Sequence, residues 1–168
     1  MKITMQVEPA SGDLAHVDYR WDTDTAILIA NFDGNREAAE GMSGSIEIAG
    51  KDGSWLILDV QSGRLGGVEV AVWPDVRHVT ALTPPAEIED VRLVVPAQRQ
   101  KSGVALLQMD ATLLAESDQE ETLIHFKVGT SRAARTVRVA RDVLVDLGEA
   151  QTIKGIWLLN VPRFPDEQ

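Results

Sequence analysis

A β-hairpin pattern that occurs twice, 87 or 88 residues apart, constrains this chain more than any other feature of its sequence. The clearer copy spans residues 55–73. It has an apolar run, a turn at Gln61-Ser62-Gly63, and a second run in which valine alternates with other residues. Such alternation is typical of a strand with one buried face, and glycine permits the backbone conformation of a tight turn. Gly66-Gly67 indicates a bulge or a close backbone approach. The weaker copy spans residues 143–161.

The order of features around the hairpin repeats as well. Matched positions recur at this separation: Pro9 with Pro96, Leu58-Asp59-Val60 with Val145-Asp146-Leu147, Gly67 with Gly155, and Pro74 with Pro162. The separation returns to the same value although extra residues are present near 115–120, which chance rarely produces. We therefore predict a tandem duplication, with one unit at residues 1–82 and the other at 86–168, joined at Thr83-Pro84-Pro85. The alternative to a duplication is that the two halves are similar only because any two β-meanders look alike in sequence.

The predicted fold is all-β: two tandem copies of a roughly six-stranded antiparallel meander unit, packed together in a sandwich or barrel-like arrangement. We expect strands at residues 2–7, 16–21, 25–32, 45–49, 55–60 and 67–73, and at 90–95, 104–109, 121–128, 135–140, 143–147 and 153–160. Residues 104–109 are aligned with 16–21 in this scheme. Residues 131–147 also fit a helix by apolar spacing, but their β-branched runs favour two strands. Residues 35–41 fit one helical turn.

Composition restricts the classes of function. The 168 residues carry a formal net charge of −10 and include no cysteine. An acidic chain is poorly suited to contact phosphates, so we expect neither nucleic acid nor a membrane surface as a partner. The absence of cysteine excludes disulfides, thiolate metal sites and a cysteine nucleophile. We see no signal peptide and no membrane-spanning run, which predicts a cytoplasmic protein. The charge favours a basic partner, although solubility is the simpler explanation.

Part of the first unit resembles a known family. The residues concerned are Val17-Asp18-Tyr19, Asp22-Thr23-Asp24-Thr25-Ala26-Ile27-Leu28-Ile29, Ile57-Leu58-Asp59-Val60 and Gly63-Arg64-Leu65-Gly66-Gly67-Val68-Glu69-Val70. Over about residues 17–73 they resemble small bacterial YuzE-like domains of unknown function. The second unit matches loosely and lacks the glutamate found at Glu69. The family has no established activity to carry over to this chain, and the resemblance implies at most an antitoxin-like or immunity-like role.

Residues with catalytic or binding chemistry are few and form no known motif. Asp59 and Asp146 occupy the same position in the two units. Paired carboxylates can perform acid–base catalysis, but equivalent residues in a duplication more often hold equivalent turns. Asp22-Thr23-Asp24 is interpreted as turn chemistry and not as a metal site. His125 lies within an apolar strand and is interpreted as a hydrogen-bonded core or edge residue.

One basic cluster interrupts the acidic sequence. It consists of Arg132, Arg135, Arg138 and Arg141, which suit a phosphate or an acidic segment of a partner. On strands this spacing places the side chains on both faces, so a solvated surface that pairs with the protein's own carboxylates is the preferred interpretation.

These observations predict a non-catalytic binding or interaction protein, without cofactor or metal, whose partner is a basic protein. The alternative is an enzyme or small-ligand-binding protein that uses a cleft between the two units. The candidate binding residues are Arg132, Arg135, Arg138, Arg141, Asp59 and Asp146. A homodimer through a sheet face or edge is a further expectation, because the edges of a meander are exposed unless they are covered.

Overall fold

The structure is a computed structural model that describes residues 3–10, 12–33, 43–96 and 104–165. These residues form 14 strands and no helix, so the predicted all-β fold is confirmed. No helix in these ranges is long and apolar enough to cross a membrane. The helical turn expected at residues 35–41 lies outside the described residues.

The strands divide between the two halves of the chain. The first half contains β1 (Gln6–Pro9), β2 (His16–Asp22), β3 (Ile27–Asp33), β4 (Ser43–Gly50), β5 (Trp55–Gln61), β6 (Arg64–Val72) and β7 (Val76–His78). The second half contains β8 (Glu89–Val94), β9 (Val104–Ala111), β10 (Leu113–Ser117), β11 (Ile124–Val128), β12 (Arg135–Ala140), β13 (Val143–Leu147) and β14 (Ile153–Leu158).

Most strands lie within a few residues of their predicted positions. Residues 131–147 contain β12 and β13, so the helical alternative is wrong. Two strands, β7 and β10, were not predicted. β10 occupies the region that the sequence indicates as an insertion. In β10, Leu113 and Ala115 are buried in the alternating pattern of a strand, but the polar Glu116 and Ser117 make this pattern difficult to recognise in the sequence.

Both halves pair their strands in the same order. The antiparallel order is β2-β3-β6-β5-β4 in the first half and β10-β11-β14-β13-β12 in the second. This agreement favours tandem copies, and the duplication itself stays a prediction. One detail of the sequence alignment is wrong. Residues 104–109, which were aligned with β2, form part of β9. The strand equivalent to β2 is β10, because β10 pairs with β11 as β2 pairs with β3.

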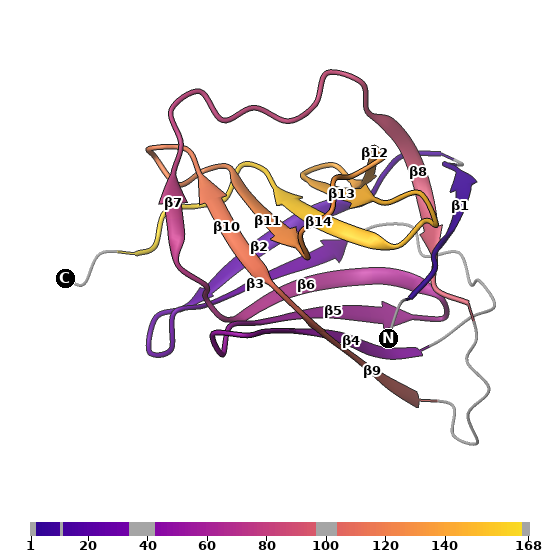
Figure 1. The fold of residues 1–168 in the computed structure, drawn as a ribbon, viewed down its shortest axis with the longest axis horizontal. Helices are drawn as coiled ribbons and strands as arrows, with labels where there is room; N and C mark the ends of the chain where they lie inside the picture. The colour runs from indigo at the N-terminus through magenta and orange to yellow at the C-terminus, as the bar shows by residue number, and fades with distance from the viewer. Residues whose placement is uncertain (1–2, 11, 34–42, 97–103, 166–168) are drawn as a thin grey trace.

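The sheet is mixed, in contrast to the antiparallel units that were predicted, because the halves exchange strands. β9 pairs in parallel with β4, β8 pairs in parallel with β12, and β7 pairs in parallel with β10. β1 pairs with β8 of the other half. One bent strand therefore passes from one half of the curled sheet to the other, since β9 leads directly into β10 (Figure 1).

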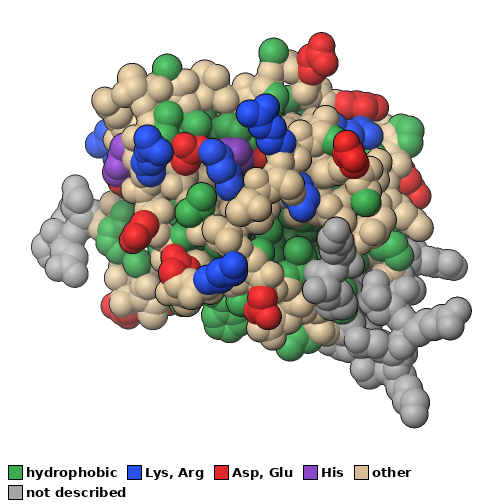
Figure 2. Space-filling view, viewed as in Figure 1, with side chains coloured by type: hydrophobic (Ala, Val, Ile, Leu, Met, Phe, Trp, Pro, Cys, Tyr) green, Lys and Arg blue, Asp and Glu red, His purple; other side chains and the backbone are tan. Residues whose placement is uncertain are grey.

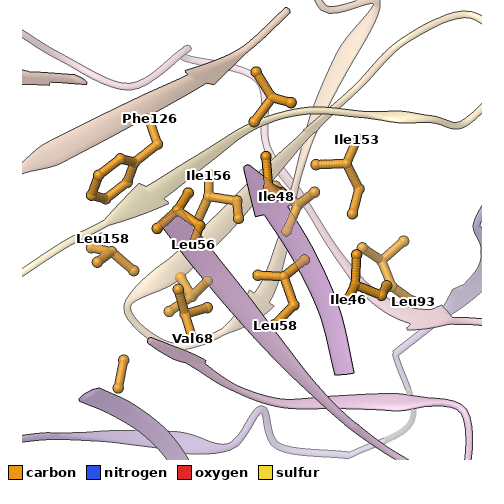
Figure 3. Close-up of a cluster of buried hydrophobic side chains, with 14 of the residues drawn as sticks. Ile46, Ile48, Leu56, Leu58, Val68, Leu93, Phe126, Ile153, Ile156 and Leu158 are labelled. Atoms are coloured by element: carbon orange, nitrogen blue, oxygen red, sulfur yellow. The ribbon is translucent and has the colours of Figure 1, made fainter. Parts of the chain in front are cut away.

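The inner faces of both halves meet in one apolar core (Figure 3). Each fully buried aliphatic or aromatic side chain in it contributes about 1.5–3 kcal/mol to stability. The side chains come from both halves: Ile46, Leu56, Leu58 and Val68 from the first, and Phe126, Ile153, Ile156 and Leu158 from the second. The predicted units 1–82 and 86–168 therefore share a single core.

Segments near both ends of the described chain also cross to the opposite half. The Met5 amide donates to the Gln151 carbonyl at 2.9 Å. The Tyr19 hydroxyl of β2 donates to the Leu159 carbonyl at 2.7 Å. Trp21 Nε1 donates to the Pro162 carbonyl at 2.9 Å. These contacts join β2 and the N-terminal segment to the second half.

Each half has a bulge at the same point of the hairpin. The β5–β6 register shifts at Gly66, and the β13–β14 register shifts at Lys154. The next residue is Gly67 in one half and Gly155 in the other. A Cβ atom at either glycine would approach within 2.8 Å of a carbonyl oxygen on the neighbouring strand. This close approach explains why glycine recurs here, and the expected bulge at Gly66-Gly67 is confirmed.

We expect Gly155→Ala to lower the free energy of unfolding by about 1–3 kcal/mol or more, because the added methyl group would overlap the Phe126 carbonyl and the Asp146 carboxylate. Gly66→Ala is the matched control. Its Cβ would meet the end of the exposed Asp59 side chain at 3.0 Å and the Gln61 side chain at an ordinary contact distance of 3.9 Å, so a change within about 0.5 kcal/mol is expected. Urea denaturation measures both, and equal losses would contradict the role given to Gly155.

Candidate functional site

Strand alternation directs one side-chain row of each strand away from the core, so each half has an outer face. In β5, Leu56 and Leu58 are buried, which directs Ile57 and Asp59 outward. In β13, Val145 belongs to the core and Asp146 faces outward. The two outer faces lie on opposite sides of the shared core, and they differ in chemistry.

A buried polar network occupies the outer face of the second half. The Asp146 carboxylate of β13 is only 5% exposed and accepts hydrogen bonds from two neighbouring strands and from β11. Thr136 of β12 donates to Oδ1 at 2.5 Å, and Trp157 Nε1 of β14 donates to the same oxygen at 3.2 Å. His125 Nε2 of β11 lies 2.7 Å from Oδ2. The network therefore links four adjacent strands.

The strand register assembles these four residues. Thr136 is opposite Asp146, and His125 is opposite Trp157. The His125 and Trp157 rings stack at 3.7 Å with an interplanar angle of 8°, and His125 is 9% exposed. The interpretation of His125 as a hydrogen-bonded core residue is thus confirmed. Its partner was missed, because nothing in the sequence pairs β11 with residues near β13.

Hydrogen bonding keeps Asp146 ionised. Burial opposes the charged form, but the hydrogen bonds from His125, Thr136 and Trp157, together with the charge interaction with His125, outweigh it. The pKa of Asp146 consequently lies below its ordinary value. Since both oxygens already accept hydrogen bonds, this carboxylate is poorly placed to take a proton from a ligand. The arrangement is suited to holding strands together.

The structure does not bring the two candidate aspartates together. Asp59 is exposed on β5, whereas Asp146 is buried on the opposite outer face. The prediction that both hold equivalent turns is wrong, because Asp146 bonds side chains of neighbouring strands and Asp59 lies within a strand. Apolar side chains fill the space between the halves, so the described residues leave no cleft there that both aspartates could line.

The four arginines are scattered, as the strand interpretation requires. Arg132 and Arg141 are exposed at the ends of β12. Arg135 pairs with Glu89 at 3.1 Å beside a hollow of about 440 Å³ that is lined by residues 86–89, Arg135 and Thr136. Arg138 faces outward, and its Nε atom is buried without a hydrogen-bond partner. Figure 2 shows Lys and Arg side chains beside the histidines on the face of the molecule that it displays.

The outer face of the first half is acidic. We define the acidic face by six outward carboxylates, which come from five strands: Asp18, Asp22, Glu47, Asp59, Glu69 and Asp110. Arg20 is an outward cation on the same face. Within the described ranges, Asp18, Glu47, Asp59, Glu69 and Asp110 form no hydrogen bond or ion pair with another side chain, although carboxylates elsewhere are paired, as Glu116 is with Lys127 at 2.6 Å.

Apolar side chains lie among these carboxylates. Ile29 and Ile57 are half-buried between them, and Trp55, Val72 and Leu106 are 36%, 46% and 58% exposed. Trp55 and Val72 are direct cross-strand neighbours. Sequence reasoning missed this face. Alternation alone places single carboxylates outward, but the strand register is needed to align the five strands that carry them.

No metal site is evident among the described residues, in which no group of three or more His, Asp and Glu side chains is arranged around a common point. No protein-family model and no curated protein matches the chain. The resemblance to YuzE-like domains therefore stays a prediction.

We expect Asp146→Ala to lower the free energy of unfolding by about 3–5 kcal/mol, because three buried donors would lose their acceptor. Asp59→Ala removes a carboxylate from the equivalent position, where it is exposed, and should change stability by no more than about 0.5 kcal/mol. Chemical denaturation of both variants tests this contrast, which fails if the two losses are similar.

The depressed pKa of Asp146 also predicts a pH dependence. Its ionised form stabilises the fold above the unfolded-state value of 3.8, and this contribution is lost as the pH falls through the lower folded-state value. Asp146→Asn lacks this titration, so the stability gap between wild type and variant should narrow as the pH falls below about 4. A gap that is constant down to about pH 2 would show that Asp146 does not titrate in this way.

Proposed function

We propose that this chain is a non-catalytic binding protein whose acidic face holds a basic protein partner. The observation that carries the proposal is a set of exposed or half-buried outward carboxylates, five of them without a side-chain partner among the described residues, around apolar side chains on one continuous sheet face. Folding alone does not require this arrangement, because paired or scattered carboxylates would keep the protein soluble equally well.

The two components of the face would have different effects on binding. Exposed ion pairs contribute about 0.2–1 kcal/mol each, and they mainly accelerate association and select the partner's charge. Trp55, with Val72 beside it, supplies the aromatic and apolar area that usually carries the affinity of an interface. A partner with a basic rim around an apolar centre would complement both. The net charge of −10 adds attraction at longer range.

An antitoxin-like or immunity-like role is the specific version of this proposal. Its support is the resemblance of residues 17–73 to YuzE-like domains, together with the acidic charge. The alternative, an enzyme or ligand-binding protein with a cleft between the halves, has less support, since the core fills that space and Asp59 and Asp146 face opposite sides.

Binding of poly-L-lysine, followed by NMR chemical shifts, tests the acidic face. We expect shifts in the outward residues of β3, β5 and β6 and none in β11 to β14. The triple variant Glu47→Gln, Asp59→Asn, Glu69→Gln should weaken binding roughly tenfold at low salt, because it removes three surface ion pairs of about 0.5 kcal/mol each. Raising the salt concentration should weaken the wild-type complex, because the charges are screened.

A matched triple variant separates the location of the charges from their number. Asp75→Asn, Glu87→Gln and Glu149→Gln remove the same three charges from exposed positions outside the acidic face. We expect this variant to bind nearly as well as the wild type. Equal weakening by both triples would mean that the attraction is general and that the acidic face is not the site.

A further inference from the structure

The free edge of β9 is unusual among the strand edges of this sheet. On one side, all eight residues from Val104 to Ala111 pair in parallel with Ser43–Gly50 of β4, without a register shift. On its other side, β9 has no partner strand within the described ranges. Backbone N–H and C=O groups along such an edge are able to pair with a further strand.

The other edges are protected in the usual ways. β2 presents the charged Asp18, Arg20 and Asp22 outward, β7 has only three residues, and β1 has four and ends at Pro9. β8 pairs with β12, β1 and β6, and at Val94 it has β1 on one side and β6 on the other. Short strands, charges and proline all discourage the addition of another strand.

β9 has none of these protections. Its sequence, VALLQMDA, contains no proline or lysine, and Asp110 is its only charged residue. Leu106 is 58% exposed on the outer side, while Leu107 and Met109 are buried toward the core. A long, regular and apolar edge of this kind promotes association unless another strand covers it.

We propose that β9 pairs with β9 of a second copy, antiparallel about a two-fold axis, so that two sheets join into one. A second copy suits this edge because it brings the same long strand with a single charged residue, and the position of that charge selects the orientation. Antiparallel pairing places the two Asp110 carboxylates at opposite ends of the junction, whereas in-register parallel pairing would set them side by side. An axis at Leu107 would bring Leu106 opposite Gln108 on the outer side and continue the row of buried side chains on the inner side.

The dimer and the basic partner of the acidic face respond oppositely to salt. Two copies that each carry a charge of −10 repel one another, so screening should strengthen the dimer. Screening weakens the attraction between the acidic face and a polycation. The dimer does not depend on the proposed function, and the two can fail separately.

Sedimentation analysis of the full chain at about 0.01 M and about 1 M salt, where the Debye length falls from about 30 Å to about 3 Å, tests the dimer. We expect a monomer–dimer equilibrium that shifts toward dimer at high salt. Leu106→Lys should weaken dimerisation at least tenfold. Leu114→Lys is the matched control, because Leu114 is similarly exposed, at 53%, but lies on β10, which is paired with β7 and β11. The Leu114→Lys variant should dimerise as the wild type does. A wild type that is monomeric at both salt concentrations, or a Leu106→Lys variant that dimerises normally, overturns the proposal.

Hydrogen exchange on the wild type gives an answer even if Leu106→Lys fails to fold. Pairing would protect outward-pointing backbone amides of residues 104–111, and dilution into the monomer range should remove that protection while β5 and β13 stay protected. Protection of β9 that does not change with protein concentration, in a sample that does dimerise, places the interface elsewhere and rejects the β9 junction.

Discussion

The packing of two curved sheet halves against each other across one apolar core is the constraint on which the rest of this molecule depends. A unit of about 80 residues buries a smaller share of its surface when alone than a domain of twice that length, and each half here supplies only one wall of the core. The exchange of β8 and β9 between the halves keeps the walls in register. Because the inner side chains are committed to this contact, the two outer faces are free to differ, and they carry the polar chemistry of the protein.

The outer faces show how equivalent backbone positions acquire different environments. Asp146 is buried because the neighbouring strands supply Thr136, His125 and Trp157 as donors. In the first half, the strand register places Ser45, Ile29 and Glu69 at the positions equivalent to Thr136, His125 and Trp157. Asp59 stays exposed there. A carboxylate can leave water only where donors replace its hydration. The same strand geometry thus gives a structural network in one half and a charged, exposed surface in the other.

Much of the fold was predictable because it is encoded locally. Alternation and turn residues place the hairpin at residues 55–73, its bulge at Gly66, and the two strands that compete with a helix at residues 131–147. β10 was missed because its outward Glu116 and its polar Ser117 resemble a loop. The parallel pairs, the Asp146 network and the acidic face were not predictable. Each of these features depends on which distant strands lie side by side. Tertiary packing determines that arrangement, and the alternation within a single strand carries no information about it.

The interlocking of the two halves has a consequence for biosynthesis. Leu56, Leu58 and Val68 leave the ribosome well before Ile156 and Leu158, their neighbours in the core, have been translated. At about 5–20 residues per second, the roughly 80 residues of the second half take on the order of 4–16 s to appear. During that interval the nascent first half carries an uncovered apolar wall, and the edge of β4 that later pairs with β9 is open. The speed of translation and the protection of the emerging chain therefore influence how much protein reaches the native state.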